Sequence, residues 1–448
     1  MRMAEEALAG FDPVEYINTP RWQESRMGLD RITQLMERLG NPQDSLRVVH
    51  VAGTNGKGST CAYISGVLQA AGYRTGLFTS PYIIEFSDRI RIDGCNISPE
   101  ALMRATLEVR AVAEAMSDHP TEFELMTAVA FVAFKQAGCE CAVIEVGLGG
   151  RLDSTNVLSH PEVCVLAPIA LDHTHLLGDT VEAIAREKAG IIKPGASVVS
   201  ARQAEGAKCV IEQAAAALDA PITWVDADAL SESRLEEAVQ DGHAIPMRVF
   251  SYAGFSRLAT RLLGTYQPQN AALAIEACLA LRARGFNVSD EAICQGISSA
   301  RWPGRFEIVA HEPTFIVDGG HNPQGARVLV ESLKSVFPGR KVTFLVGVLA
   351  DKDYSAMLRQ VVPLGSAFVC VQPPNPRALS AQDLAEAIAG IAREMPAGEG
   401  DVKLHVAGDI ASGVARARDI ARADGLVCAF GSLYSIADIM VALRKLGA

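Results

Sequence analysis

Residues 47–60 read RVVHVAGTNGKGST, and this stretch decides the fold class. The first part, Arg47–Ala52, is apolar and rich in β-branched residues, as in a short buried strand. The glycine-rich run 53–58 interrupts that pattern, and a helix is expected from about Ser59 to Ala71. A buried strand, a glycine-rich turn and a helix are the parts from which parallel α/β proteins build a phosphate-binding junction.

The composition of this turn, Gly53-Thr54-Asn55-Gly56-Lys57-Gly58-Ser59-Thr60, suits a nucleoside triphosphate. Glycines let backbone N–H groups approach phosphate oxygens, and the helix N-terminus favours negative charge. Lys57 is placed to reach the β- and γ-phosphates, and Ser59 or Thr60 to face a metal ion. The spacing departs from the general Walker pattern, because only two residues separate Gly53 from the Gly-Lys pair. We predict an ATP-binding loop here; the alternative is a glycine-rich turn with a surface lysine.

The bulk composition sets the class of protein and excludes some partners. A chain of 448 residues is too long for one ordinary core, so two domains are expected. Its formal net charge of −11 argues against a nucleic-acid partner, which requires a concentrated basic surface. A local cluster of donors for a small anion remains compatible with that charge.

Targeting and redox signals indicate a soluble cytoplasmic protein. The first residues, MRMAEEALAG, are acidic and lack the apolar segment of a secretory signal. No stretch approaches the roughly 18 apolar residues of a membrane helix, so no membrane partner is expected. The ten cysteines follow no repeating spacing, which favours reduced thiols over disulfides or a zinc site.

Strand-like and helix-like runs alternate along most of the chain, which is typical of α/β proteins. Residues 224–263 break the alternation and are predicted to form a small β-rich elaboration. We place the domain boundary at the turn-rich segment Arg301–Gly304. The predicted fold is thus a P-loop ATPase domain of mostly parallel sheet (residues 1–300) and a smaller Rossmann-like α/β domain (residues 301–448).

Further polar residues follow other predicted strands of the first domain. Glu145 ends the strand Cys141–Val146, where ligands bind in open α/β sheets, and suits magnesium or a backbone-capping role equally. His173 follows the strand Val163–Ile169 and could complete a metal shell; a polar loop role is the simpler alternative. The His-x-His spacing of 173–175 also fits a zinc hydrolase, but no partner cluster supports that hypothesis. Lys188, near a helix end, would by itself complement the helix dipole.

The second domain contains one comparable junction, Asp318-Gly319-Gly320-His321-Asn322-Pro323, between a strand and a helix. Asp318 at the strand end suits a ribose hydroxyl, as acidic residues do in nucleotide-binding folds. Arg305 and Asn270 lie near the interdomain segment, and each could equally be a structural hydrogen-bonding group.

A series of segments in fixed order is more specific than any of these signals. It comprises GTNGKGST (53–60), TSP (79–81), EVGLGGRLDSTN (145–156), LDHTHLLG (171–178), IAREKAGIIKPG (184–195), RWPGRFE (301–307), DGGHNP (318–323) and FGSLY (430–434). Together they resemble the folylpolyglutamate synthase family, including bacterial members that double as dihydrofolate synthase, within the Mur ligase superfamily. The resemblance runs from about Tyr16 to Tyr434, and the Asn-Gly-Lys-Gly-Ser loop resembles the folate branch rather than the cell-wall branch.

The resemblance implies roles for individual residues. It implies that Lys57 and the loop amides hold the triphosphate, and that Lys188 is carbamylated. The remaining roles are magnesium ligands (Ser59, Ser80, Glu145, His173), nucleotide contacts (Asn270, Arg305, Asp318), a substrate-side acid (Asp153) and positions linked to the incoming glutamate (His321, Ser432). Two departures from the family pattern are Tyr82, where histidine is common, and Gly320, where alanine usually precedes the histidine.

The implied reaction is an ATP-dependent amide ligation through an acyl phosphate, with Lys57, Lys188 and His321 as catalytic residues. Expected cofactors are ATP and two magnesium ions; expected substrates are dihydropteroate, reduced folates and L-glutamate. We expect a monomer, with the nucleotide between two domains that close. The alternatives are a Mur-type ligase acting on a cell-wall precursor and a P-loop ATPase without ligase activity.

Overall fold

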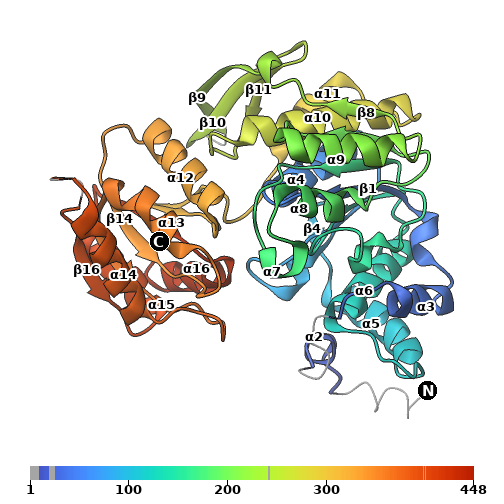
Figure 1. Cartoon of the computed structure of the whole chain (residues 1–448), viewed down its shortest axis with the longest axis horizontal. Helices are drawn as coiled ribbons and strands as arrows, with labels where there is room; N and C mark the ends of the chain where they lie inside the picture. Colours follow the sequence, from blue (N-terminus) through green and yellow to red (C-terminus); the bar gives the residue numbers. More distant parts are fainter. Residues whose placement is uncertain (1–9, 20–25, 241–242, 397, 399, 448) are drawn as a thin grey trace. The chain divides into compact units, whose positions relative to one another are not determined.

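The computed structural model describes residues 10–19, 26–240, 243–396, 398 and 400–447 (Figure 1). The acidic start, from which we expected no secretory signal, lies largely outside these residues. Contacts divide the chain into two compact units. Unit 1 holds the described residues up to Tyr82, Phe86–Ala229 and Gln269–Ser299; unit 2 holds Ile83–Glu85, Leu230–Pro268 and the described residues from Ala300 onward. Each unit has its own sheet.

Unit 1 is built on an eight-stranded sheet of order β4-β3-β2-β5-β1-β6-β7-β8. Neighbouring strands from β2 to β8 in this order are parallel, and β3 and β4 extend the sheet as antiparallel strands at one edge. The strands are β1 (Arg47–Ala52), β2 (Thr75–Phe78), β3 (Ile90–Ile92), β4 (Cys95–Asn96), β5 (Cys141–Glu145), β6 (Val163–Leu166), β7 (Ser197–Ser200) and β8 (Ile222–Trp224). The mostly parallel sheet expected from the sequence is confirmed.

The helices of unit 1 pack in pairs, α5 on α6, α8 on α9 and α4 on α11 (Figure 1). They are α2 (Pro13–Ile17), α3 (Asp30–Arg38), α4 (Lys57–Ala70), α5 (Pro99–Ala113), α6 (Glu122–Gln136), α7 (Thr174–Leu177), α8 (Val181–Ala189), α9 (Glu205–Ala216), α10 (Gln267–Ala283, which begins at the edge of unit 2) and α11 (Asp290–Ser299). Local sequence explains their starts: Ser98 Oγ accepts the Ala101 N–H at 3.2 Å, and Thr121 with Glu124 forms a capping box.

Two glycines allow α4 and α11 to approach closely. A Cβ on Gly66 would lie 2.9 Å from the Gly296 carbonyl oxygen, and a Cβ on Gly296 would lie 2.4 Å from Val67 Cα. These contacts are too short for any side chain. The helix that begins at the glycine-rich turn is therefore fixed by backbone-to-backbone packing.

Unit 2 contains a six-stranded sheet of order β12-β13-β17-β14-β15-β16. Its strands are β12 (Glu307–His311), β13 (Thr314–Val317), β14 (Val342–Val346), β15 (Gly365–Cys370), β16 (Lys403–Val406) and β17 (Leu426–Phe430), all parallel to their neighbours except β12. Its helices are α12 (Pro323–Val336), α13 (Tyr354–Val361), α14 (Ala381–Glu394), α15 (Ile410–Ala421) and α16 (Ile436–Lys445). This is the second α/β domain that the sequence predicts.

The β-rich elaboration is an antiparallel sheet of three strands, β9 (Ser231–Gln240), β10 (His243–Tyr252) and β11 (Phe255–Thr260). Our division at residue 300 left this segment with the N-terminal domain, whereas its contacts group it with unit 2. Leu235 packs against the core of unit 2, and the backbone N–H of Thr265 donates to Ser332 Oγ at 3.0 Å. Such contacts join residues that are distant in sequence, so composition alone does not indicate them.

Among the described residues, none of the helices is both long and apolar enough to cross a membrane.

Candidate active site

The glycine-rich turn between β1 and α4 is anchored to the segment that follows β6. The Thr54 N–H donates to the Pro168 carbonyl at 2.9 Å, and the Thr54 hydroxyl donates to the Ala170 carbonyl at 3.0 Å. A Cβ on Gly53 would lie 2.6 Å from Ala167 Cβ, so only glycine fits there. Gly56 has φ of 83° and a Cβ there would lie 2.5 Å from Asn270 Oδ1, which places Asn270 against the turn. The turn is thus rigidly positioned at the helix N-terminus.

Two lysines converge on this turn. Lys57 Nζ donates to the Gly53 carbonyl at 3.1 Å and to the Thr54 carbonyl at 3.3 Å. Lys188 Nζ, from the last turn of α8, donates to the same Gly53 carbonyl at 2.9 Å. Two amine groups therefore share one acceptor beside a helix N-terminus, which makes the turn a strong anion site.

Lys188 is buried, with only 5% of its surface exposed. Burial, followed by the nearby positive charge of Lys57, lowers the pKa of Lys188 to about 7, while Asp172 and Asp153 oppose the shift. The helix-terminus role that the residue type suggests does not account for this geometry, because the amine reaches the Gly53 carbonyl in the glycine-rich turn. A substantial fraction of the amine is neutral near neutral pH.

Glu145 and Ser80 are brought together at the carboxyl ends of their strands. Glu145 ends β5 and is 5% exposed, and its Oε2 accepts the Ser80 backbone N–H at 3.2 Å. Ser80 follows β2 and precedes Pro81 through a cis peptide bond. Ser59 lies in the first turn of α4 and is also buried. Glu145 ends β5, and Ser80 and Ser59 come after the neighbouring parallel strands β2 and β1. A carboxylate and two hydroxyls in this arrangement suit a hard divalent cation.

His173 stands directly before α7 in the left-handed region, with φ of 50°. Its backbone N–H donates to Asp172 Oδ1 at 2.9 Å, and its Nε2 lies 3.9 Å from the same oxygen. In the part of the chain that the structure describes, no group of three or more His, Cys, Asp or Glu side chains is arranged to hold a metal. The expected set contains one carboxylate, one imidazole and two serine hydroxyls, so water and phosphate oxygens would supply any remaining ligands.

Asp153 is buried within the turn that follows β5. Its Oδ2 accepts the Leu148 N–H at 2.8 Å, and its Oδ1 accepts the Thr155 N–H at 3.0 Å and the Thr155 hydroxyl at 2.5 Å. Burial raises the pKa of Asp153, and these hydrogen bonds oppose the rise. The carboxylate therefore shapes the turn, and its role toward substrate stays a prediction.

Asp318 stabilises the turn of unit 2 that joins β13 to α12. Its Oδ2 accepts the Phe306 N–H at 2.9 Å and the Tyr266 hydroxyl at 3.3 Å, and its Oδ1 accepts the Gly320 N–H at 2.8 Å. Burial raises the pKa of Asp318, while the positive charge of Arg305 is the largest opposing influence. Asp318 and Arg305 are thus neighbours, as expected for residues of one site.

His321 and Ser432 also lie at strand-to-helix connections of unit 2. His321 Nδ1 is 2.9 Å from the Gly319 carbonyl oxygen. Since a carbonyl can only accept, Nδ1 carries a proton and Nε2 is the acceptor nitrogen of the neutral ring. Ser432 follows β17, is 4% exposed, and its Oγ accepts the Tyr434 N–H at 3.3 Å. Their roles toward glutamate stay predictions.

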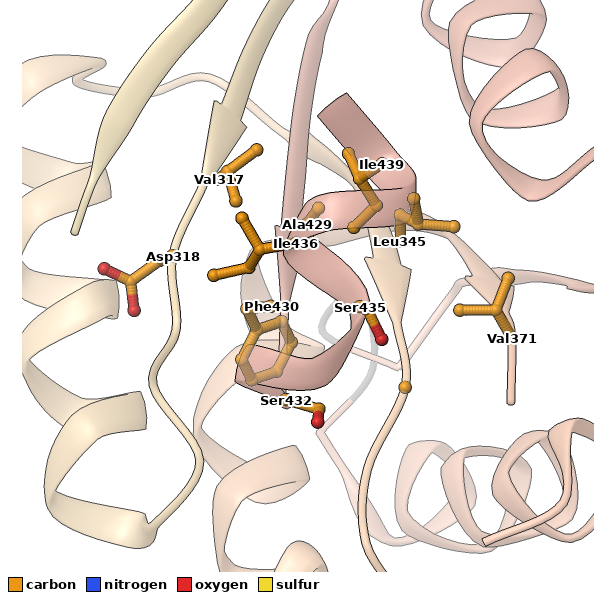
Figure 2. Close-up of a pocket in the computed structure, with 11 residues that line it drawn as sticks. Val317, Asp318, Leu345, Val371, Ala429, Phe430, Ser432, Ser435, Ile436 and Ile439 are labelled. Atoms are coloured by element: carbon orange, nitrogen blue, oxygen red, sulfur yellow. The ribbon is translucent and has the colours of Figure 1, made fainter. Parts of the chain in front are cut away.

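A small pocket lies between the sheet of unit 2 and α16 (Figure 2). Its walls are mostly apolar side chains of β13, β14, β17 and α16, with Asp318 and Ser432 at its edge. It has room for roughly one water molecule, so it admits neither a nucleotide nor an amino acid. Ser435 Oγ is buried here without a hydrogen-bond partner among the described residues, which a single bound water would satisfy.

The chain matches two models of known protein domains. The Mur ligase middle domain matches residues 51–278, and the Mur ligase glutamate ligase domain matches residues 304–433. The dihydrofolate synthase/folylpolyglutamate synthase of Bacillus subtilis is 41% identical over 367 residues, covering 80% of this chain and 84% of the relative.

Two solved structures are similar over nearly the whole chain. One, described as E. coli FolC in complex with DHPP and ADP, has a TM-score of 0.83 and 30% identity, covering 98% of this chain and 99% of its own. The other is the bifunctional folylpolyglutamate synthase/dihydrofolate synthase of Yersinia pestis complexed with AMPPNP and Mn ion. It has a TM-score of 0.80 and 32% identity, covering 96% of this chain and 97% of its own.

Proposed function

This chain belongs to the dihydrofolate synthase/folylpolyglutamate synthase family of Mur ligases, and from this premise we propose that it joins L-glutamate to a pteroate or folate carboxylate at the expense of ATP. The observation that carries the proposal is the convergence of Lys57 and Lys188 on the Gly53 carbonyl, at 3.1 and 2.9 Å. Lys57 and the helix N-terminus suit a polyphosphate anion, and Lys188 is held beside them as the amine that we propose is modified. The motif-based resemblance and the family assignment agree.

The chemistry follows from the poor reactivity of a carboxylate toward an amine. Transfer of the γ-phosphoryl group of ATP to a carboxylate oxygen gives an acyl phosphate and releases ADP. The glutamate amine then attacks the acyl carbon, loses a proton, and expels inorganic phosphate as the amide forms. Lys57 offsets the charge that develops on the transferring phosphoryl group, by positioning and by electrostatics.

We assign the magnesium ligands to Ser59, Ser80, Glu145 and His173. The contact between Glu145 and Ser80 and the burial of Ser59 support the assignment. When bound, magnesium neutralises charge on the phosphate oxygens. The chain's own part is to hold a carboxylate, hydroxyls and an imidazole at the ends of adjacent strands.

A carbamate on Lys188 is also part of the proposal. Carbamylation forms a bond between the amine nitrogen and the carbon of CO2 and releases a proton, so it requires the neutral amine. The lowered pKa of Lys188, about 7, supplies that form. The product is an anion with two oxygens, which could pair with Lys57 or bind magnesium.

The remaining roles rest on the family resemblance and on placement within each unit. We assign nucleotide contacts to Asn270, Arg305 and Asp318, glutamate contacts to His321 and Ser432, and a substrate contact to Asp153. The packing of Gly56 against Asn270 supports the first of these, because any nucleotide on the turn passes close to that amide.

The test is ADP release by the whole chain with dihydropteroate or with tetrahydrofolate, each with and without L-glutamate. The proposal expects release that depends on glutamate with both acceptors. Glutamate-independent release would indicate an ATPase without ligase activity, and use of only one acceptor would remove bifunctionality. Activity solely with a uridine-nucleotide cell-wall precursor would favour the other branch of the superfamily.

We further propose a cytoplasmic monomer, as expected from the sequence. All ten cysteines are free thiols in the structure, which supports a reducing compartment. Sedimentation equilibrium of the active preparation tests the oligomeric state.

A further inference from the structure

His50 is a buried polar residue in the middle of the central strand of unit 1. It is 0% exposed, and its register partners are Ile144 on β5 and Cys164 on β6. Val48 and Ala52, which share its face of β1, belong to two different apolar clusters, so His50 lies where these clusters meet. A polar ring in such a position costs stability unless it is hydrogen-bonded, which calls for a physical reason for its presence.

The ring begins a directed chain of hydrogen bonds. Thr155 Oγ1 lies 2.8 Å from His50 Nε2 and 2.5 Å from Asp153 Oδ1. Asp153 Oδ1 also accepts the Thr155 N–H, so it acts as an acceptor. The single hydroxyl proton of Thr155 is therefore donated to Asp153, and the hydroxyl accepts from His50. His50 is neutral with its proton on Nε2, which agrees with burial lowering its pKa to about 3.

Asp153 also binds the turn after β5, so the hydrogen bonds connect His50 to this turn. Its other oxygen holds the Leu148 N–H at 2.8 Å. The same turn lies against α8, because the Arg151 N–H donates to the Glu187 carbonyl at 2.7 Å. A Cβ on Gly150 would lie 3.1 Å from Lys188 Cα, so the turn touches the backbone that carries that lysine.

The chain of contacts leads back to β1, because Lys188 Nζ donates to the carbonyl of Gly53, which directly follows the strand that contains His50. We infer that His50 is a positioning residue: through Thr155 and Asp153 it fixes the turn that seats Lys188 in the phosphate loop. This inference rests on the proposed function. It predicts a defect in the chemical step with little change in nucleotide binding, because Lys57 and the loop amides keep their own anchors.

The first experiment compares His50→Leu with His50→Gln in the full-length enzyme. Leucine has similar bulk but no donor, whereas the glutamine amide nitrogen reaches about as far as Nε2. We expect His50→Leu to lower kcat for glutamate-dependent ADP release by about 10- to 100-fold, as for lost outer-shell partners. The Kd of ADP, measured by calorimetry, should change by less than about twofold, and His50→Gln should recover most of kcat. Equal kcat for both variants, whether low or wild-type, overturns the inference.

A second pair covers the case in which His50→Leu does not fold. Thr155→Val removes the hydroxyl at nearly constant shape, and Thr155→Ser keeps it. The inference expects low kcat in Thr155→Val and recovery in Thr155→Ser. Where the double variant His50→Leu/Thr155→Val folds, its kcat should be no lower than that of either single variant, because all break one chain. Multiplicative losses would mean two independent structural effects and would contradict it.

A third readout needs no turnover. Cyanate reacts with neutral amines, and mass spectrometry of peptides gives its rate at Lys188. At neutral pH we expect slower labelling of Lys188 in Thr155→Val than in the wild type, because an amine released from burial regains its ordinary, higher pKa and is mostly protonated. Labelling of the surface residue Lys208 should be unchanged. Equal rates at Lys188 would contradict the inference. If instead the wild-type enzyme shows no glutamate-dependent ADP release, the proposed function fails, and the labelling result still decides whether His50 seats Lys188.

Discussion

The turn after β1 in unit 1 and the turn after β13 in unit 2 both join a buried parallel strand to a helix, yet groups of opposite charge hold them. In the first turn, Lys57 and Lys188 donate to the Gly53 carbonyl. In the second, Asp318 accepts the backbone N–H groups of Gly320 and Phe306. In the first turn two amines converge on one carbonyl, and the second is organised around a buried acidic side chain.

We therefore assign a binding role to the first turn and a structural role to the second. A phosphate group can replace a backbone carbonyl as the partner of an amine without dismantling the turn, because the anchors of Thr54 remain. Asp318 has no such freedom, since its oxygens already hold two segments of unit 2 together. Substitutions in the first turn should therefore affect catalysis more than stability, and substitutions in the second should affect both.

The largest expected effect is that of Lys57→Ala. Removing the cation that offsets the charge of the transferring phosphoryl group should lower kcat by roughly 10²- to 10³-fold. The melting temperature should stay near that of the wild type. Lys208→Ala, on the exposed face of α9, is the matched control and should be fully active. Near-normal turnover in a folded Lys57→Ala protein would remove the phosphate-loop assignment.

The next effect concerns Lys188 and pH. With bicarbonate present, wild-type activity should rise with pH through about 7 as the amine becomes neutral and available for carbamylation. Lys188→Arg keeps the positive charge but cannot form the carbamate, so kcat should fall by roughly 100-fold and this pH dependence should disappear. A high-resolution map of the wild type prepared with bicarbonate, showing unbranched density at Nζ with nucleotide bound, would contradict carbamylation.

The lowered pKa of Lys188 also predicts that the free energy of unfolding depends on pH. The pKa of Lys188 is about 7 in the folded state, against an ordinary value of 10.5, so between these pH values unfolding takes up a proton. The wild type should therefore gain stability relative to Lys188→Met as pH rises from 7 to 10. Urea unfolding of both proteins across this pH range measures the difference between their free energies of unfolding. A difference that does not change with pH would mean that the pKa of Lys188 is not lowered in the folded protein.

Removing a proposed metal ligand should have a smaller and more specific effect. Glu145→Gln keeps an acceptor for the Ser80 N–H but loses the negative charge, so the magnesium concentration for half-maximal activity should rise about 10- to 100-fold. His173→Ala should shift the titration in the same direction. Unchanged magnesium titrations in both variants would place the metal elsewhere.

The smallest catalytic effect is expected in the second turn. Asp318→Asn keeps the shape but replaces one acceptor oxygen by a donor that faces a backbone N–H. The free energy of unfolding should fall by about 1–3 kcal/mol, and KM for ATP should rise by roughly tenfold with kcat nearly unchanged. A loss in kcat comparable to that of Lys57→Ala would end the distinction between the two turns.

Local patterns predicted most of the elements but few of the contacts. The strand Arg47–Ala52 occurs at the expected residues, and the helix expected from about Ser59 to Ala71 spans Lys57–Ala70, because an apolar run and a glycine-rich turn encode them. The strand expected over Val163–Ile169 ends at Leu166, near Pro168, which cannot donate to a ladder.

Long-range placement explains what the sequence could not supply. Physical arguments alone made Lys188 a helix-end cation, and only the family resemblance singled it out; its burial depends on a turn distant in sequence. No role was predicted for His50, because the sequence around a histidine in an apolar strand does not indicate its hydrogen-bond partner. The grouping of β9–β11 with unit 2 likewise depends on contacts between distant segments.

The close approach of α4 and α11 has an evolutionary consequence. Neither Gly66 nor Gly296 can gain even a methyl group without a shift of a helix backbone. We therefore expect both positions to resist substitution, although neither belongs to the proposed site. In a comparison of relatives, such a pair would appear as invariant as the glycines of the phosphate loop. We therefore expect constraint on glycine in this protein to extend beyond the residues of the site, to every position where two backbones touch.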